Sequence, residues 1–239
     1  MPGYQTKQES IAVAGVADLQ IRSLLDRQQF ADPFGTADRL GISSAAWPLF
    51  GLLWPSAAHL AARLALRPVD AAERILEIGC GLALASLVGH RRGADMTASD
   101  CHPLAGAFLL ENLRLNSLRP MKYRHGQWGG ASAFVANTAA AAELPADGEV
   151  HGLFGLIIGS DVLYERDTGG ALAAFIQLHA TPASEVWIVD PDRGNRPAFN
   201  RQMDRLGFDR TETRLTASLP AGSGTVPGYK GRLLVYQRQ

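Results

Sequence analysis

The sequence contains little cysteine and has no excess of charge of either sign. Its 239 residues include two cysteines, Cys80 and Cys101, too few for a disulfide scaffold or an all-cysteine zinc site. Lys and Arg together number 23, as do Asp and Glu, so the formal net charge is zero. A neutral chain has no global attraction for nucleic acid or an anionic membrane, so we expect neither as a partner. We also expect no bound metal.

The sequence also lacks a signal peptide and a convincing membrane-spanning run. Residues 1–10 are polar, without the apolar stretch that a signal peptide requires. The most apolar region, residues 45–66, is interrupted by Pro48, Pro55 and Arg63. We therefore expect a cytoplasmic protein whose two cysteines are buried thiols, with a redox pair as the less favoured alternative.

Residues 74–100 predict a strand, a glycine turn, a helix and a second strand. Residues 74–78 are mostly apolar, and Gly79 and Gly81 follow at positions where a tight turn favours glycine. Residues 82–90 have apolar side chains at helical spacing, and residues 94–99 form the second predicted strand, which ends at Asp100. A helix that begins at such a turn presents backbone N–H groups at its positive end.

This unit favours a ligand that contains a nucleoside. Ligands of doubly wound sheets bind beyond the carboxyl ends of the strands, and Asp100 is placed there to accept hydrogen bonds from ribose hydroxyls. The dinucleotide fingerprint needs a third glycine where this chain has Leu84, which disfavours NAD. The alternative is a purely structural turn that packs a helix on the sheet.

Strands and helices alternate along the rest of the chain, which predicts an α/β fold. We expect a hairpin at 8–14 and 19–25, followed by a polar connection over 26–41. Further helices are expected at 56–66, 103–116, 167–179 and 196–206, and further strands at 121–124, 153–160, 185–189, 208–215 and 232–236. The strand at 153–160 is apolar throughout, as in a central parallel strand. We assign no chemistry to the alanine-rich residues 131–152. Residues 1–70 are expected to form an extension that packs on a core domain, residues 71–239.

Four short segments resemble a known family. Glu77-x-Gly79-x-Gly81 with Asp100 resembles motif I of class I S-adenosylmethionine-dependent methyltransferases, with Ala83 where a third glycine is common. The other three segments resemble the protein-lysine methyltransferase-like family 16; they begin at Trp54, Gln127 and Asp161 and read Trp-Pro-Ser-Ala, Gln-Trp-Gly and Asp-Val-Leu-Tyr.

The resemblance implies a Rossmann-like, seven-stranded, mostly parallel sheet whose last strand is antiparallel, and S-adenosyl-L-methionine as cofactor. In that family the first tryptophan borders the cofactor and the second lies at the adenine, where Gln127 replaces the usual acid. The implied cofactor-binding residues are Trp54, Glu77, Gly79, Cys80, Gly81, Asp100, Cys101, Trp128, Ser160 and Asp161.

The resemblance also implies a catalytic pair, Asp161 and Tyr164, at the tip of the buried strand 153–160. The acid would orient an acceptor amine and the phenol would hold it by a hydrogen bond or a cation–π contact. Asp190 and Asp192, at the next strand tip, are the rival acids. The favoured function is methylation of a protein lysine. A small-molecule N- or O-methyltransferase and a non-catalytic nucleoside-binding module remain alternatives, and the acceptor and the oligomeric state stay open.

Overall fold

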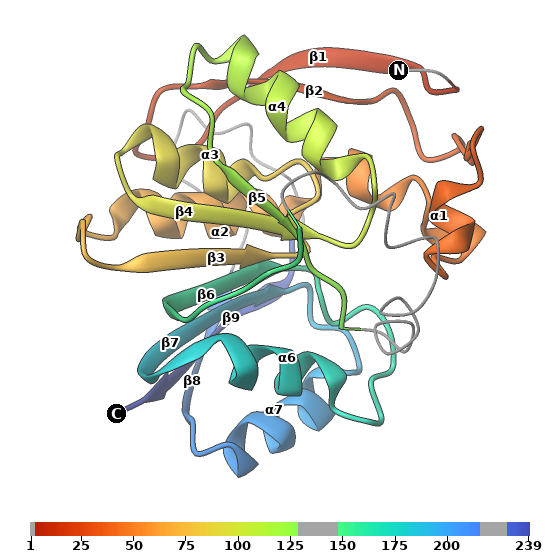
Figure 1. The fold of residues 1–239 in the computed structure, drawn as a ribbon. Coiled ribbons are helices and arrows are strands. Elements are labelled where there is room, and N and C mark those ends of the chain that lie inside the picture. Colours follow the sequence, from red (N-terminus) through yellow and green to blue (C-terminus); the bar gives the residue numbers. More distant parts are fainter. Residues whose placement is uncertain (1–2, 129–147, 216–228) are drawn as a thin grey trace.

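A seven-stranded sheet with the order β5-β4-β3-β6-β7-β9-β8 forms the centre of the structure (Figure 1). The structure is a computed structural model that describes residues 3–128, 148–215 and 229–239. The strands are β3(Arg74–Ile78), β4(Asp95–Asp100), β5(Lys122–His125), β6(Phe154–Ser160), β7(Ala180–Asp190), β8(Asp209–Leu215) and β9(Gly231–Arg238). β9 runs antiparallel to both neighbours, β7 and β8, while the pairs from β5 to β7 are parallel. This confirms the expected mostly parallel sheet with an antiparallel last strand.

Helices cover both faces of the sheet. α2(Pro55–Leu66), α3(Leu84–Arg91) and α4(Ala105–Leu115) lie on one face, and α6(Ala171–His179) and α7(Arg196–Arg205) lie on the other (Figure 1). Neighbouring residues of a central strand therefore enter different cores: Ile75 packs with the first group of helices and Leu76 with the second. Burial on both faces explains why β3 and β6 are nearly continuous apolar runs.

Several element boundaries differ from the expectation for identifiable reasons. α6 begins at Ala171 rather than 167, because Gly170 has a left-handed backbone and the Asp167 carboxylate accepts the N–H groups of Ala171 and Leu172. β7 begins at Ala180, five residues earlier than expected, although Pro182 argues against a strand. A short helix, α1(Thr36–Arg39), lies within the segment expected to be only a connection.

An N-terminal hairpin of β1(Thr6–Ile11) and β2(Leu19–Leu24) packs on α4. Two asparagines one helical turn apart bond the backbone of β2. Asn112 accepts the N–H of Arg22 at 2.8 Å, and Asn116 both accepts the N–H of Gln20 at 2.9 Å and donates to its carbonyl at 2.7 Å. The two side-chain amides thus take the place of a neighbouring strand, a role beyond the helix stop that the sequence suggests.

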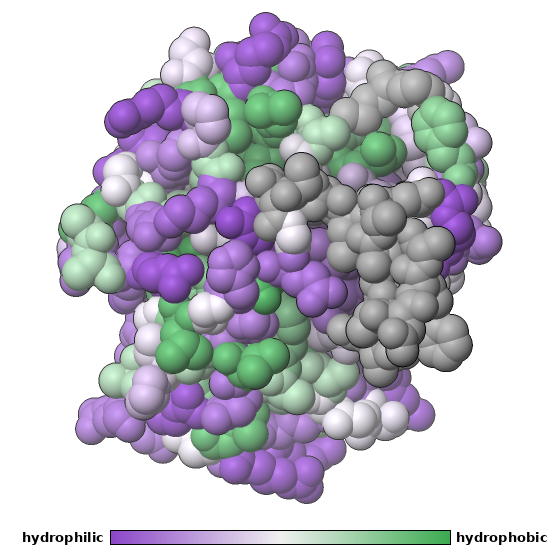
Figure 2. Space-filling view, viewed as in Figure 1, coloured by the Kyte–Doolittle hydropathy of each residue, from purple (hydrophilic) through white to green (hydrophobic). Residues whose placement is uncertain are grey.

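Within the described residues, one stretch, Ser44–Leu66, is long and apolar enough by composition to cross a membrane, and half of it is buried inside the protein. The stretch is divided into two short 3-10 turns, η1(Ser44–Ala46) and η2(Leu49–Gly51), and α2. α2 packs against α3 and the sheet, so the apolar composition serves the core. On the face shown in Figure 2, hydrophobic residues lie in small groups between hydrophilic ones.

Candidate active site

The turn between β3 and α3 leaves no room for side chains at two glycines. Gly79 and Gly81 have left-handed backbones, with φ of 56° and 52°. A Cβ atom at Gly79 would lie 2.9 Å from Cγ1 of Val162, and one at Gly81 would lie 3.0 Å from the carbonyl oxygen of Phe50. Glycine is therefore required both by the backbone conformation and by the close approach of neighbouring segments.

Ala83 stands where a third glycine is common, and it adopts the conformation that glycine would favour. Its φ of 57° and ψ of 38° are left-handed, and it forms the N-cap position of α3. A left-handed residue other than glycine costs roughly 1–2 kcal/mol. The turn therefore keeps the geometry of a three-glycine motif despite the substitution.

Asp100, at the end of β4, fastens this turn from the neighbouring strand. Its carboxylate accepts the N–H of Gly81 and the N–H of His102, each at 2.8 Å. Burial raises the pKa of Asp100, while those hydrogen bonds and the nearby His125 oppose the rise. One carboxylate thus shapes the turn and faces the cleft, where its remaining lone pairs can accept ribose hydroxyls.

Glu77 lies behind the turn rather than in the cleft. It is 1% exposed, and its carboxylate accepts both the N–H and the hydroxyl of Ser86 in the first turn of α3. Burial raises the pKa of Glu77 to about 7, against the lowering effect of the Ser86 hydrogen bonds. The structure therefore places this predicted cofactor-binding residue as a buried cap of the helix, beside the positive end of the dipole.

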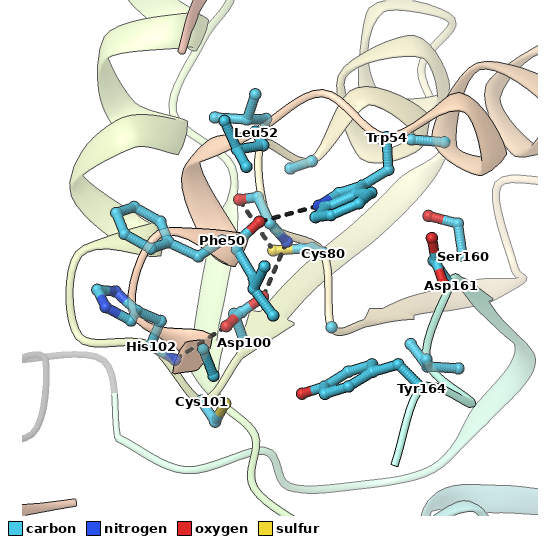
Figure 3. Close-up of a pocket in the computed structure, with 18 of the residues that line it drawn as sticks. Phe50, Leu52, Trp54, Cys80, Asp100, Cys101, His102, Ser160, Asp161 and Tyr164 are labelled. Atoms are coloured by element: carbon cyan, nitrogen blue, oxygen red, sulfur yellow. Dashed lines mark hydrogen bonds between the residues drawn. The ribbon is translucent and has the colours of Figure 1, made fainter. Parts of the chain in front are cut away.

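A cleft of about 280 Å³ opens at the carboxyl ends of the strands (Figure 3). The structure brings together here every predicted site residue except Glu77. Its lining includes Trp54, Gly79, Cys80, Gly81, Asp100, Cys101, Trp128, Ser160, Asp161 and Tyr164. Residues from four strand ends and from the segment before α2 therefore share one concave surface, the usual place for ligands of such sheets.

Two tryptophans supply flat apolar surfaces to the cleft. The Trp54 indole donates to the carbonyl of Leu49 at 2.9 Å, which fixes its ring at the mouth (Figure 3). Trp128 follows β5, and its ring lies 3.3 Å from the Cβ position built at Gly79. Both indoles thus line the cleft, as a role beside the cofactor requires. Stacking of Trp128 on the adenine stays a prediction.

The two cysteines are free thiols, and both line the cleft. Burial raises the pKa of Cys80 and of Cys101, and the nearby Asp100 carboxylate raises both further. Both thiols are therefore protonated at neutral pH, and a protonated thiol is a poor nucleophile.

The tip of β6 carries the predicted catalytic pair. Asp161 has a left-handed backbone with φ of 58°, and its N–H donates to the carbonyl of Val189 on β7 at 2.8 Å. Its carboxylate pairs with the Nε atom of Arg193 at 2.8 Å. Tyr164 is half-exposed at the open side of the cleft, and burial of the rest of its ring, with nearby acids, raises the pKa of the phenol.

The rival acids at the tip of β7 lie outside the cleft lining. Asp190 is fully buried, and its carboxylate accepts the backbone N–H of Arg193 at 3.0 Å. Asp192 pairs with Arg196 and Arg232. The geometry therefore presents Asp161, rather than either rival, to a ligand in the cleft.

Sequence reasoning missed Arg193 and the apolar wall of the cleft. The wall comes from the segment before α2 and includes Leu49, Phe50, Leu52 and Leu53. The sequence feature that could have revealed this wall is the high density of apolar residues in a segment that its prolines prevent from forming one helix. Arg193 offers no such signal, because it faces Asp161 only when β6 and β7 are neighbours.

The comparisons with known proteins agree with the fold. No protein-family model matches the chain. Over 205 residues the chain is 25% identical to the electron transfer flavoprotein beta subunit lysine methyltransferase of Mus musculus. The match covers 84% of this chain and 70% of that protein.

Two solved structures share the fold. A methyltransferase from Pyrococcus furiosus matches with a TM-score of 0.54 and 17% identity, over 86% of this chain and 99% of that chain. A T. thermophilus 16S rRNA methyltransferase in complex with AdoMet and guanosine matches with a TM-score of 0.56 and 14% identity, over 100% of this chain and 52% of that chain.

The residues of the cleft fit a nucleoside cofactor. A buried acid and two indole rings line the cleft, and the backbone of the glycine turn at Gly79 and Gly81 forms part of its surface. Together with the sequence relationship to a lysine methyltransferase and the shared fold, these features are those of an S-adenosylmethionine-dependent methyltransferase.

Proposed function

We propose that the protein methylates the side-chain amine of a lysine in a protein substrate. The observation that carries this proposal is the position of Asp161 and Tyr164 at the tip of β6, in the same cleft as the glycine turn and Asp100. Tyr164 is 43% exposed, so the reacting end of the cleft is reached from the surface. An acceptor that is part of a folded protein needs such an open approach.

The residues that would hold S-adenosylmethionine follow from the lining. Asp100 would accept the ribose hydroxyls, Trp128 and Cys101 would border the adenine, and the backbone at Gly79 and Gly81 would lie against the cofactor. When bound, the cofactor supplies an electrophilic methyl group on a positively charged sulfur.

The contribution of the protein is to position the acceptor and exclude water. The amine must first lose a proton, because an ammonium has no lone pair and the ordinary lysine pKa is about 10.4. The proton would pass to solvent, and the neutral nitrogen would then take the methyl group that the bound cofactor supplies, with the carbon–sulfur bond as the one that breaks. Asp161 would orient the amine, and Tyr164 would contact it through its ring or hydroxyl.

The mouse relative is named for the beta subunit of electron transfer flavoprotein, and we propose the corresponding subunit as the first acceptor to test. Purified protein is incubated with tritiated S-adenosylmethionine and this subunit, and in parallel with total cell extract. We expect label on a lysine of a protein band, mapped by mass spectrometry. Label only in the small-molecule fraction would favour a metabolite acceptor instead. No transfer into either fraction would contradict an enzymatic role.

The control for this experiment is Asp161→Asn. Asparagine tolerates the left-handed backbone and removes only the charge. Transfer that continues at the rate of the parent protein would show that the label does not arise from the chemistry assigned to Asp161.

A further inference from the structure

Arg193 occupies a position that the proposed chemistry does not yet explain. It lies on the loop between β7 and α7, lines the cleft, and pairs through Nε with the Asp161 carboxylate at 2.8 Å. The Asp161 side chain is 10% exposed and that of Arg193 is 40% exposed, so the pair is only partly screened by solvent. The acid that would orient the acceptor is therefore already matched by a positive charge.

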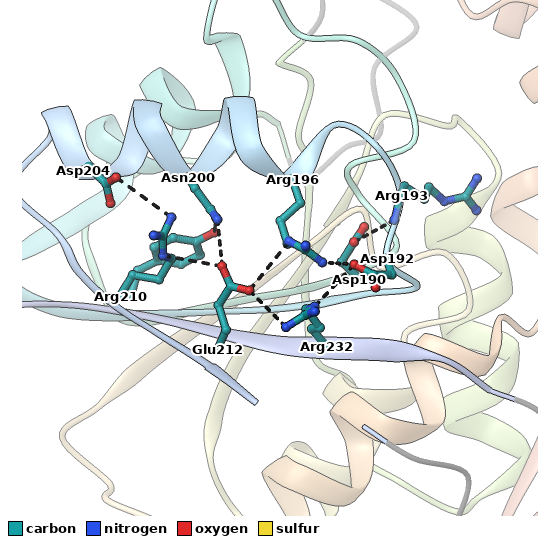
Figure 4. A network of polar contacts seen from close by, with 10 residues as sticks. Asp190, Asp192, Arg193, Arg196, Asn200, Asp204, Arg210, Glu212 and Arg232 are labelled. Atoms are coloured by element: carbon teal, nitrogen blue, oxygen red, sulfur yellow. Dashed lines mark hydrogen bonds and ion pairs between the residues drawn. The ribbon is translucent and has the colours of Figure 1, made fainter. Parts of the chain in front are cut away.

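The loop holds Arg193 firmly in this position. The buried Asp190 carboxylate accepts the Arg193 N–H at 3.0 Å, and the following helix begins three residues later. Asp192 turns the chain through a left-handed conformation and pairs with Arg196 and Arg232. In Figure 4 the Arg193 side chain extends away from this network. Asp190 and Asp192 thus fix the backbone of the loop, while the Arg193 guanidinium reaches Asp161.

An unpaired carboxylate at this place would work against methyl transfer. It would attract the acceptor lysine as an ammonium and raise the pKa of that amine, which disfavours the reactive neutral form. An unpaired guanidinium would repel a sulfonium. A guanidinium paired with the carboxylate removes both effects, because the pair carries no net charge.

We propose that Arg193 is a positioning residue that neutralises Asp161, so that the cleft accepts the lysine as a neutral amine. This inference rests on the proposed lysine methylation. Asp161 accepts a hydrogen bond from the amine and so orients it. The Asp161–Arg193 pair leaves no net charge at this place. Arg193 stays bonded to Asp161 when the acceptor binds.

Other charged and titratable groups surround the pair. Tyr164 comes from the segment after β6, Asp190 from the end of β7, Arg196 from α7 and Tyr229 from the segment before β9. These side chains are the same in variant and parent, although loss of the Arg193 charge also raises the pKa of the Asp190 carboxyl.

The test compares Arg193→Gln, Arg193→Lys and the control Arg205→Gln, which removes an exposed positive charge at the end of α7. The turnover number for the electron transfer flavoprotein beta subunit is measured with saturating cofactor from pH 6.5 up to the pH at which the rate of the parent no longer rises. We expect the pH–rate profile of Arg193→Gln to be displaced upward by about one pH unit, so that this variant is about ten-fold slower at pH 7 and reaches the plateau rate of the parent only at higher pH. Lysine at position 193 should restore much of the rate at pH 7, and Arg205→Gln should match the parent.

A lower plateau rate with no displacement of the pH–rate profile would mean a purely structural role for Arg193 and would overturn the proposal, as would an unchanged rate at pH 7. A second measurement does not depend on the protein acceptor. Nα-acetyl-lysine amide, whose side chain is a free ammonium, is titrated at pH 7 into each protein saturated with S-adenosylhomocysteine. Arg193→Gln should bind this ammonium several-fold more tightly, because Asp161 is released. Equal affinity would overturn the inference, whereas failure of the parent to methylate any lysine would overturn only the proposed function.

Discussion

Two buried carboxylates, Glu77 and Asp100, define the turn at the centre of the cleft, and they do so from opposite sides. Glu77 caps α3 from within the protein, and Asp100 bonds the backbone on the ligand side. Each has its pKa raised by burial. A raised carboxylate pKa makes the folded state bind a proton more tightly than the unfolded chain.

The first prediction follows for Glu77. Its pKa of about 7 in the folded protein exceeds its ordinary value of 4.5, so this group lowers the free energy of unfolding as pH rises between these values. Glutamine does not titrate and keeps an acceptor for Ser86. The stability of the parent relative to Glu77→Gln should therefore be greater at pH 5 than at pH 8, by up to about 3 kcal/mol. Urea unfolding at both pH values measures this, and a pH-independent difference would contradict it.

Asp100→Ala is expected to weaken cofactor binding and the fold together. The loss of hydrogen bonds to a charged group should lower the affinity for S-adenosylhomocysteine roughly 10- to 100-fold in a calorimetric titration. The variant also leaves the N–H groups of Gly81 and His102 without their acceptor. Affinity equal to that of the parent would show that the ribose is held elsewhere.

At Asp161, two substitutions separate charge from backbone conformation. Asp161→Asn should slow single-turnover methyl transfer roughly 10- to 100-fold with little change in stability. Asp161→Ala should show a similar loss of transfer and, in addition, about 1–2 kcal/mol lower stability, because alanine disfavours the left-handed backbone. Transfer by Asp161→Asn at the parent rate would move the catalytic role away from this acid.

Among the elements, the N-terminal hairpin is joined to the rest of the protein by hydrogen bonds with two asparagine side chains. Two antiparallel strands are marginally stable on their own, and β2 is held to α4 by Asn112 and Asn116. The double variant Asn112→Ala/Asn116→Ala should lose roughly 2–4 kcal/mol of unfolding free energy, since buried backbone groups of β2 lose their partners. Limited proteolysis should then cut first within residues 3–27. A cleavage pattern identical to that of the parent would show that apolar packing alone retains the hairpin.

The elements that the sequence predicted best are those whose own residues determine their burial. β3 and β6 are nearly continuous apolar runs because both faces of the sheet are covered, and the glycines at 79 and 81 mark the turn between β3 and α3. β1 was misplaced by two to three residues because its side chains are polar and mostly exposed, so its limits are set by pairing with β2. The mostly parallel sheet with an antiparallel last strand came from the family resemblance, because periodicity along the chain contains no information on how strands pair.

The same distinction holds for the candidate site. Residues directly after a predicted strand, such as Asp100 and Asp161, could be placed in the cleft from their position in the chain. Arg193 could not, because its partner is 32 positions away and the contact needs β6 beside β7. Glu77 was placed in the cleft because it belongs to the motif, and only the packing of α3 reveals that its side chain points inward. Residues 131–147 of the alanine-rich segment 131–152, and most of the connection between the expected strands 208–215 and 232–236, lie outside the described residues.

For the whole molecule, the extension and the sheet share one core. Leu19, Ile21 and Leu24 of the hairpin are at most 1% exposed and belong to the same cluster as Leu84 and Phe108. Removal of residues 1–27 would therefore expose apolar surface on α4 and its neighbours. We expect this truncated protein to bind a hydrophobic dye and to aggregate, as measured by fluorescence and light scattering. A soluble fragment with the melting temperature of the parent would show that the hairpin is an accessory element.

The position of β9 between β7 and β8 has a consequence for co-translational folding of the protein. β8 has no partner among the described strands except β9, and β9 ends only at Arg238. During translation, β8 and the edge of β7 that later pairs with β9 have no hydrogen-bond partner until residues 231–238 emerge. An unpaired edge invites wrong pairing between chains. A nascent chain stalled before Gly231 should therefore be held by chaperones, and a few seconds of delay at that point should lower the yield of native protein.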